Sequence, residues 1–327
     1  MEPYLIRLIP LFRNYLWGGN NLQDKLGKQV PGPGVWAESW EIIDHPEHSS
    51  QVANGPLAGM SLREVIDQHA SWLLGESLAA KRQLPLLLKY LDCQRVLSVQ
   101  VHPDDAFALR MASPDLGKTE AWIIIDAAPD AVLYAGLRSG TTAEDLRQAI
   151  DQGNVEACLH ALHPQSGDCV FIPAGTVHAL GAGLLVAEIQ QSSNTTFRIF
   201  DWDRVDANGQ PRALHVEQAL QVIDFSAAPR EFQQPCPAED PHFEDLVKCD
   251  KFVLRRSCPT AKQLVLAGDD RFHFITVPRG RAEISLSGSS KIEVLKSGES
   301  ALIPAAAPAI RMDLGDATTV LDMFVPA

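Results

Sequence analysis

Four side chains of the kinds that bind metal ions lie at or near the ends of strands predicted from the sequence. Residues 97–101 alternate apolar and polar side chains, so Gln100 and His102 are expected to project from one face of a half-buried strand. Glu120 opens a second apolar run, and a third run leads to His178. Amide, imidazole and carboxylate donors of this kind hold Zn²⁺ or another divalent first-row metal. For His102 and Glu120 to converge, we expect their two strands to pair.

Each of these residues alone has a simpler interpretation. A single histidine at a strand end is usually a satisfied core or surface side chain, and Glu120 alone would be a solvated charge. The set is more specific, because it joins a Gln-x-His pair, an acid before an apolar strand and the pattern Gly-Asp-x₄-Pro-x-Gly-x-x-His ending at His178. Gly167 suits a tight turn, and Pro173 with Gly175 shapes the bend before the histidine. The combination favours a metal site.

Charged residues near these candidates are able to take part in a reaction. Lys118 comes two residues before the acid of the second strand. Lys89 lies within a short apolar strand, so its ammonium either reaches the surface or points into a polar cavity. Glu188 lies on a strand after the histidine turn, and Arg198 lies in the next alternating segment. For Arg198, a surface salt bridge with a nearby aspartate is the alternative to a role in a site.

The composition is that of a globular chain without affinity for polyanions. The 327 residues are 46% hydrophobic and 21% charged, which is enough to bury a substantial core. The formal net charge of −13 repels a phosphate backbone, so general nucleic-acid binding is not expected. No apolar run approaches the roughly 18 to 20 residues of a membrane span, and the N-terminus lacks the features of a signal peptide. The 6 scattered cysteines indicate reduced thiols in a cytoplasmic protein.

The order of the predicted elements suggests two parts joined by a linker. Residues 61–74 begin with a Ser-x-x-Glu capping box and predict a helix, and residues of about 141–164 predict a helical insertion. Residues 227–245 are rich in proline and acidic residues and lack periodicity, which is typical of a linker. We therefore expect a catalytic domain with N-terminal strands over residues 1–226 and a smaller β domain over residues 246–327.

A weak internal repeat links the two parts. Residues 298–305 (GESALIPA) resemble residues 167–174 (GDCVFIPA). The second copy has Ala309 where the first has His178, and no Gln-x-His pair accompanies it. The two halves of the first motif resemble the paired metal motifs of the cupin superfamily. We therefore expect a mainly β protein with two cupin-type barrels (double-stranded β-helices), the first metal-binding and the second degenerate, with the helical insertion added.

A wider set of residues gives a more specific resemblance. The positions that carry it are Lys89, Gln100 to Pro103, Lys118 to Glu120, Pro173 to His178, Glu188, Ser193, Asn194 and Arg198. Together they resemble the type I mannose-6-phosphate isomerase (phosphomannose isomerase) family in its short bacterial form. The similarity runs from Trp17 through Arg198 and, more loosely, through the C-terminal repeat. It is more diagnostic than a cupin motif alone, because the charged residues take family positions around the metal ligands.

This resemblance implies a reaction and a set of site residues. Members of the family interconvert mannose 6-phosphate and fructose 6-phosphate by metal-assisted proton transfer through an enediol. With the composition, the resemblance implies one Zn²⁺ per chain, a sugar phosphate as substrate, a cytoplasmic monomer, and no nucleic-acid or membrane partner. The implied residues are Gln100, His102, Glu120 and His178 as metal ligands, Arg198, Glu188 and Lys118 as catalytic groups, and Lys89 and Ser193 as substrate contacts.

Two alternatives and one departure from the family pattern stay open. A non-catalytic sugar-binding or sugar-sensing cupin would show an eroded first site, whereas the first motif here is intact. A metal-dependent cupin dioxygenase usually relies on a donor set richer in histidine. Many relatives carry an acid where this chain has Asn194, so the identity of the proton-transferring base, between Glu188 and Lys118, is left open.

Overall fold

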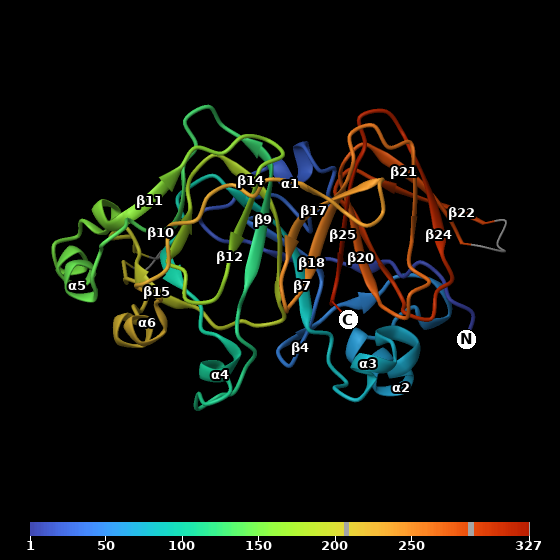
Figure 1. The fold of residues 1–327 in the computed structure, drawn as a ribbon, viewed down its shortest axis with the longest axis horizontal. Coiled ribbons are helices and arrows are strands. Elements are labelled where there is room, and N and C mark those ends of the chain that lie inside the picture. Colours follow the sequence, from blue (N-terminus) through green and yellow to red (C-terminus); the bar gives the residue numbers. More distant parts are fainter. Residues whose placement is uncertain (206–208, 287–290, 327) are drawn as a thin grey trace. The chain divides into compact units, whose positions relative to one another are not determined.

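The architecture is that of a computed structural model in which the described residues are 1–205, 209–286 and 291–326. Strands account for most of the regular structure in these ranges (Figure 1). The chain divides into two compact units. We name them the site unit, which comprises residues 16–19 and 91–233, and the terminal unit, which comprises residues 1–15, 20–90 and 234–327.

Two groups of antiparallel strands build the site unit. The first is a five-stranded sheet in the order β11-β10-β13-β8-β15, and the second places β9 between β12 and β14. Their bounds are β8 Val99–Val101, β9 Glu120–Ala127, β10 Leu133–Leu137, β11 Leu159–Leu162, β12 Cys169–Ile172, β13 His178–Leu180, β14 Leu184–Gln191 and β15 Phe197–Phe200. Because β8 and β9 belong to different groups, the expected pairing of the strands that carry His102 and Glu120 is wrong.

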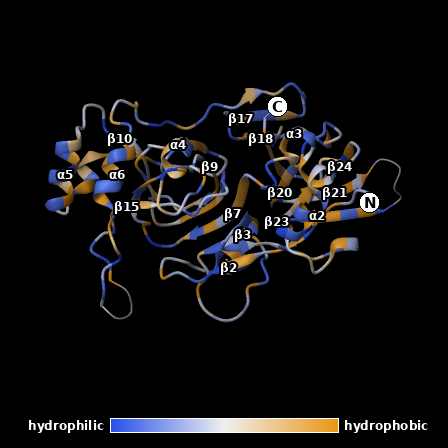
Figure 2. Cartoon of the chain, turned by 90° about the horizontal axis from the view of Figure 1, so that it is seen from below, coloured by the Kyte–Doolittle hydropathy of each residue, from blue (hydrophilic) through white to orange (hydrophobic). Residues whose placement is uncertain are grey.

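Short helices complete the site unit. They are α4 Asp105–Ala108, α5 Ala143–Asp151, the 3₁₀ helix η2 Val155–Cys158 and α6 Val216–Val222. Both α5 and α6 carry hydrophobic and hydrophilic residues, as Figure 2 shows. Their buried side chains, such as Leu146 and Ala219, join a core with Val99 and Val101 of β8. The helices thus cover the core side of the strand that leads to the predicted metal ligands.

The helix expected over residues 141–164 is shorter in the structure, where α5 ends at Asp151. Gly153 then takes a left-handed backbone conformation with φ of 67°. After η2, β11 pairs antiparallel with β10. Leu159 fits helical spacing in the sequence, but it reaches the same core from a strand. Strand pairing therefore overrides the local helical pattern.

The C-terminal part of the terminal unit is a pair of packed sheets. Their strand orders are β16-β17-β18-β25-β20-β23 and β19-β24-β21-β22. Their bounds are β16 Cys236–Pro237, β17 Phe243–Lys248, β18 Val253–Ser257, β19 Gln263–Leu266, β20 His273–Arg279, β21 Arg281–Leu286, β22 Ile292–Lys296, β23 Glu299–Ile303, β24 Ile310–Leu314 and β25 Thr319–Phe324. Ile275, Ala301, Ile284 and Met312, two from each sheet, meet in one core, so the sheets pack face to face.

The N-terminal part of the terminal unit contains short strands and helices. The strands are β1 Leu8–Ile9, β2 Leu11–Arg13, β3 Glu38–Ile42, β4 Asp44–His45, β5 His48–Ser49, β6 Gln51–Val52 and β7 Leu86–Cys93, whose last residues enter the site unit. The helices are α1 Asn21–Asp24, η1 Gly55–Leu57, α2 Leu62–Leu74 and α3 Glu76–Ala79. The helix predicted from the capping box is confirmed, because Ser61 and Glu64 make both reciprocal hydrogen bonds at the start of α2. Within the described ranges, no helix has the length and hydrophobicity that a membrane crossing requires.

The two copies of the sequence repeat adopt similar local structure. Gly167 and Gly298 both have positive φ angles, and β12 begins two residues after Gly167 while β23 begins one residue after Gly298. Residues 20–90 cluster with the C-terminal strands, whereas the sequence assigned them to the first of two domains. Within the expected linker, β16 pairs with β17. The predicted domain boundaries at residues 226 and 246 refer to parts that fold independently, so they stay predictions.

A buried charge network in the terminal unit has consequences for stability. His273 Nδ1 lies 2.8 Å from Asp322 Oδ1, and His273 Nε2 lies 3.2 Å from Asp269 Oδ1. Burial by itself lowers the pKa of His273, but the charge of Asp322 and the hydrogen bonds to both carboxylates outweigh it and raise the pKa to about 9. The folded protein therefore keeps a proton on His273 that the unfolded chain releases above its ordinary pKa of 6.5.

We expect the free energy of unfolding to fall by about 3 kcal/mol as the pH rises from 6.5 to about 9. The stabilisation is complete below the pKa of the unfolded chain and is lost as the pH rises through the folded pKa. Denaturant titrations across this range measure the change. His273→Gln is the matched comparison, because glutamine cannot titrate and its curve should be flatter. Equal slopes for both proteins would contradict an ionised His273.

Candidate metal centre and active site

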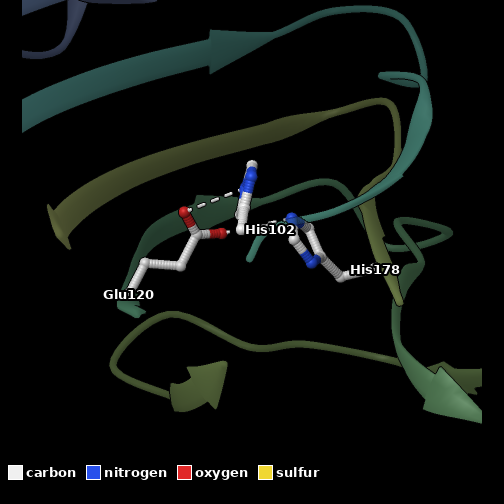
Figure 3. Close-up of side chains that lie close together, drawn as sticks. All are labelled: His102, Glu120 and His178. Atoms are coloured by element: carbon white, nitrogen blue, oxygen red, sulfur yellow. Dashed lines mark ion pairs between the residues drawn. The ribbon is translucent and has the colours of Figure 1, made fainter. Parts of the chain in front are cut away.

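Three ligand-type side chains meet inside the site unit (Figure 3). His102 follows β8, Glu120 opens β9 and His178 opens β13. One ligand atom from each lies within 4.8 Å of the others, and all three side chains are buried. His102 Nε2 is 3.5 Å from Glu120 Oε2, and His178 Nε2 is 3.3 Å from Glu120 Oε1. The histidines and the glutamate therefore converge because two strand groups face each other.

Backbone carbonyls fix the orientation of both imidazoles. His102 Nδ1 donates to the carbonyl of Thr195 at 3.0 Å, and His178 Nδ1 donates to that of Thr176 at 2.9 Å. A carbonyl only accepts, so each Nδ1 carries the proton and each Nε2 keeps its lone pair. Burial lowers the pKa of His178 to about 4, so this ring is neutral at neutral pH. A neutral imidazole whose second nitrogen is hydrogen-bonded is the usual form of a histidine metal ligand.

Strand register places Gln100 and Arg198 on the same face as His178. Gln100 on β8 is the direct partner of His178 on β13 and of Arg198 on β15, and direct partners point to the same side of a sheet. Gln100 Nε2 donates to His178 Nε2 at 3.2 Å. Arg198 Nη1 donates to the carbonyl of Ala213 at 2.9 Å, while its buried Nε has no hydrogen-bond partner among the described residues. The guanidinium of Arg198, whose Nε donor is not used by the described residues, therefore lies on the same face as the cluster.

The ammonium group of Lys118 reaches into the cluster. Its Nζ lies 2.9 Å from Glu120 Oε2 and donates to His102 Nε2 at 3.0 Å. Lys118 precedes β9, which begins at Glu120, and its ammonium group still reaches the Glu120 carboxylate. Both contacts use atoms that would serve as metal ligands, so Lys118 and a divalent ion compete for Glu120 and His102.

A second carboxylate lies on the strand next to Glu120. β14 pairs with β9 so that Gln190 is opposite Glu120 and Glu188 is opposite Trp122. Trp122 Nε1 donates to Glu188 Oε2 at 3.1 Å, and the Trp122 ring packs edge-on against His178 with centroids 5.4 Å apart. Trp122 therefore couples the orientation of buried Glu188 to that of a ligand-type histidine.

The donor chemistry of the cluster fits a divalent metal ion. Imidazole nitrogens and a carboxylate are typical protein ligands of Zn²⁺ and other first-row divalent ions. The Nε2 lone pairs of His102 and His178 already accept from an ammonium and an amide, which shows that both point toward electropositive groups. Glu120 is buried and forms an ion pair with Lys118. His102, Glu120 and His178 thus form a possible metal site.

The two predicted substrate contacts have other partners in the structure. Lys89 Nζ lies 4.0 Å from Glu38 Oε2 and 5.1 Å from the centre of the Trp40 ring, all within the terminal unit. Of the two alternatives for Lys89, the structure favours a polar interior over the surface, because the residue is only 9% exposed. Ser193 Oγ donates to Asp115 Oδ2 at 2.9 Å. The hydroxyl of Ser193 therefore has a structural role.

The residues that hold the ligands in place carry weak sequence signals, and none was predicted as a site residue. The carbonyls of Thr176 and Thr195 are backbone atoms that any residue type would supply. Asp115 is one acid among several in the segment between His102 and Glu120. Trp122 is the one residue of this group that the sequence could have indicated. It comes two residues after Glu120 on a predicted strand, so the two side chains share a face.

Fold and site together define a mainly antiparallel β protein with a buried histidine–carboxylate cluster suited to a metal ion and with cationic side chains beside it. Residues 5–121 match a family model described as phosphomannose isomerase type I, catalytic domain. The probable mannose-6-phosphate isomerase GmuF of Bacillus subtilis (strain 168) is 44% identical over 216 residues, which cover 66% of this chain and 67% of the relative. The mannose-6-phosphate isomerase ManA of the same organism is 40% identical over 228 residues, 70% of each chain. This chain belongs to the type I phosphomannose isomerase family.

Solved structures agree with this assignment. A crystal structure of the mannose 6-phosphate isomerase from Bacillus subtilis matches with a TM-score of 0.87 and 31% identity, covering 98% of this chain and 99% of that chain. A variant of the phosphomannose isomerase from Salmonella typhimurium matches with a TM-score of 0.79 at 17% identity, covering 99% of this chain and 100% of that chain, which is a likeness of fold alone. The family resemblance predicted from the sequence is confirmed.

Proposed function

We propose that this protein interconverts mannose 6-phosphate and fructose 6-phosphate, moving a proton between C1 and C2 of the sugar through an enediol. The observation that carries the proposal is the buried cluster of His102, Glu120 and His178 with Lys118 bonded to it, in a chain of this family. Proton transfer between adjacent carbons needs a base beside the carbon and stabilisation of the charge that develops on the neighbouring oxygens. Buried charged groups around this cluster supply both requirements.

The metal ion that we propose is one Zn²⁺ per chain. Its ligands would be Gln100, through its amide oxygen, with His102, Glu120 and His178. When bound, zinc supplies a Lewis acid and a template for adjacent sugar oxygens. Zinc is supported by the donor set, because two imidazoles and one carboxylate are the protein ligands of many catalytic zinc sites.

Glu188 and Lys118 are the proposed proton-transferring groups. Glu188 Oε2 accepts a hydrogen bond from Trp122, which orients the carboxylate on the strand next to Glu120. A carboxylate held in this way is suited to take the proton from a sugar carbon and return it to the neighbouring carbon. Lys118 Nζ carries protons inside the cluster and is suited to donate one to a sugar oxygen.

Arg198 is the proposed stabiliser of the enediolate. Its guanidinium keeps its charge at any working pH, and its buried Nε is a donor not used by the described residues. Lys89 and Ser193 are proposed as substrate contacts. Because the Ser193 proton is directed to Asp115, the hydroxyl would serve the sugar as an acceptor.

We propose the wider organisation on similar grounds. The facing strand groups of the site unit support a first, metal-binding cupin-type barrel, and the packed C-terminal sheets of the terminal unit support a second, degenerate one. The proposed boundaries are 1–226 and 246–327, joined by 227–245. The net charge of −13 supports a protein that binds neither nucleic acid nor an anionic membrane surface. We propose a cytoplasmic monomer whose ligand is a sugar phosphate.

A coupled assay of mannose 6-phosphate conversion, before and after chelation, tests reaction and cofactor together. We expect activity to disappear with a chelator and to return with Zn²⁺, because the clustered ligands lose the ion that organises them. A folded, zinc-loaded sample without turnover would contradict the reaction and favour another sugar substrate or a binding role. Full turnover after complete removal of zinc would contradict the cofactor.

A further inference from the structure

One carboxylate oxygen in the site unit collects hydrogen bonds from three consecutive residues. Asp115 Oδ2 accepts from Ser193 Oγ at 2.9 Å, from the backbone N–H of Asn194 at 3.0 Å and from Thr195 Oγ1 at 2.9 Å. The backbone N–H of Thr195 donates to Ser193 Oγ at 3.3 Å, which closes the turn on itself. Hydrogen bonds to a charged acceptor are roughly twice as strong as neutral ones. Asp115 therefore clamps the segment 193–195, which we call the clamp loop.

The clamp loop presents a carbonyl to a ligand-type histidine. Thr195 donates its side-chain proton to Asp115, and its backbone oxygen accepts from His102 Nδ1 at 3.0 Å. That bond keeps the proton on Nδ1 and aims His102 Nε2 at Glu120. Asp115 is thus connected to a predicted metal ligand through one residue, without touching the cluster itself in any contact described.

The clamp also has a rigid base. Asp115 lies in the segment that joins His102 to Glu120, where Asp105 Oδ1 accepts from the Gly117 N–H at 2.8 Å and from Gln191 Nε2 at 2.9 Å. A Cβ atom on Gly117 would lie 2.5 Å from the backbone at Asp105, so the chain passes too closely for any other residue. Asp105 therefore links the part of the segment that follows Asp115 to the end of β14, two residues before the clamp loop.

We propose that Asp115 is a positioning residue for the metal centre, which holds the carbonyl of Thr195 against His102 Nδ1 and so fixes the ring orientation that metal binding needs. The inference rests on the proposed metal-dependent function, but it concerns the affinity for the ion and not the reaction. It also assigns Ser193 to the clamp.

Asp115→Ala should weaken zinc binding about 10-fold, since loss of an outer hydrogen-bond partner of a metal ligand lowers affinity by about 10- to 100-fold and Asp115 acts through one further bond. Competition with a chromophoric chelator measures the dissociation constant for zinc. At saturating zinc, kcat should recover, because the metal ligands themselves are unchanged. In zinc-free protein, ¹⁵N spectra of labelled histidine should show His102 losing its fixed Nδ1–H form.

Asp145→Ala is the matched control. Asp145 Oδ2 also accepts two hydrogen bonds, from the Thr142 N–H and hydroxyl, but it caps α5. The Asp145→Ala variant should melt at a lower temperature than the wild type and bind zinc with the same affinity. If Asp115→Ala does not fold, the zinc dissociation constant of Asp115→Asn tests the proposal. Asparagine keeps the shape and one oxygen acceptor while removing the charge, so zinc binding should again be weaker than in the control.

Two results would overturn the proposal. One is a zinc dissociation constant in a folded Asp115 variant within two-fold of the Asp145→Ala control. The other is a raised KM with unchanged zinc affinity, which would mean that the clamp loop acts on the sugar directly. A wild-type protein that binds zinc and does not isomerise mannose 6-phosphate would refute the reaction, while the zinc competition would still decide the role of Asp115.

Discussion

We expect His178→Ala to lose bound zinc and isomerase activity together. His178 supplies one of two imidazole nitrogens in the cluster, and its Nε2 lies 3.3 Å from Glu120 Oε1. If the ligands share the roughly 10–16 kcal/mol of a zinc site about equally, losing one lowers affinity by about 100-fold or more. Zinc content after dialysis and turnover in the same sample measure the two losses.

His163→Ala is the control for this variant, because His163 is an exposed histidine of the same unit. His178 also packs against Trp122, so the alanine variant leaves a space beside the ring. His178→Leu fills most of that space without offering a metal-binding atom, so it separates loss of the ligand from loss of packing. Stoichiometric zinc in a folded His178→Ala protein would show that His178 is not a ligand.

Much of the local structure follows from short stretches of sequence. The capping pair of Ser61 and Glu64 fixes the start of α2, because both hydrogen bonds form between residues three apart. The alternation around Gln100 places it on one face of β8, where its register partner is His178. These features depend on neighbours in the chain or on a period of two, so they need no knowledge of the tertiary fold.

Convergence in space was harder to predict. His102 and Glu120 were expected to meet through paired strands, but they meet across facing strand groups. Period-2 patterns say which side chains share a face and not which sheets face each other. The predicted helix ends earlier than residue 164 for a related reason. Leu159 contributes to the core from a strand, and its apolar side chain fits a helical spacing only by coincidence.

The supporting contacts of the site show the same limit. The carbonyls that orient the histidines belong to Thr176 and Thr195, and a backbone atom leaves no trace in residue types. Ser193 was predicted beside the substrate from a family pattern, while the structure gives its proton to Asp115. A residue near a site in sequence can serve that site through the loop it stabilises.

We expect Arg198→Ala to keep its zinc and to lose turnover. Arg198 is the register partner of Gln100 on the face that also carries His178. We propose that its charge stabilises the negative charge that develops on the substrate. The described contacts of Arg198 are to the Ala213 carbonyl and to His215, and not to His102, Glu120 or His178, so the metal site should survive its removal. Loss of one preorganised donor to an oxyanion lowers kcat by about 100- to 1,000-fold. Single-turnover kinetics with a zinc-loaded variant measure this loss.

Arg212→Ala is the matched control, because it removes a nearby guanidinium that is bound to Asp201. It should retain turnover close to that of the wild type. Arg198→Lys should recover part of the rate, since it restores the charge but not the planar set of donors. If Arg198→Ala turned over at nearly the wild-type rate with its zinc in place, the enediolate would have to be stabilised without Arg198. Lys118, the other cation of the site, would then be the first residue to test.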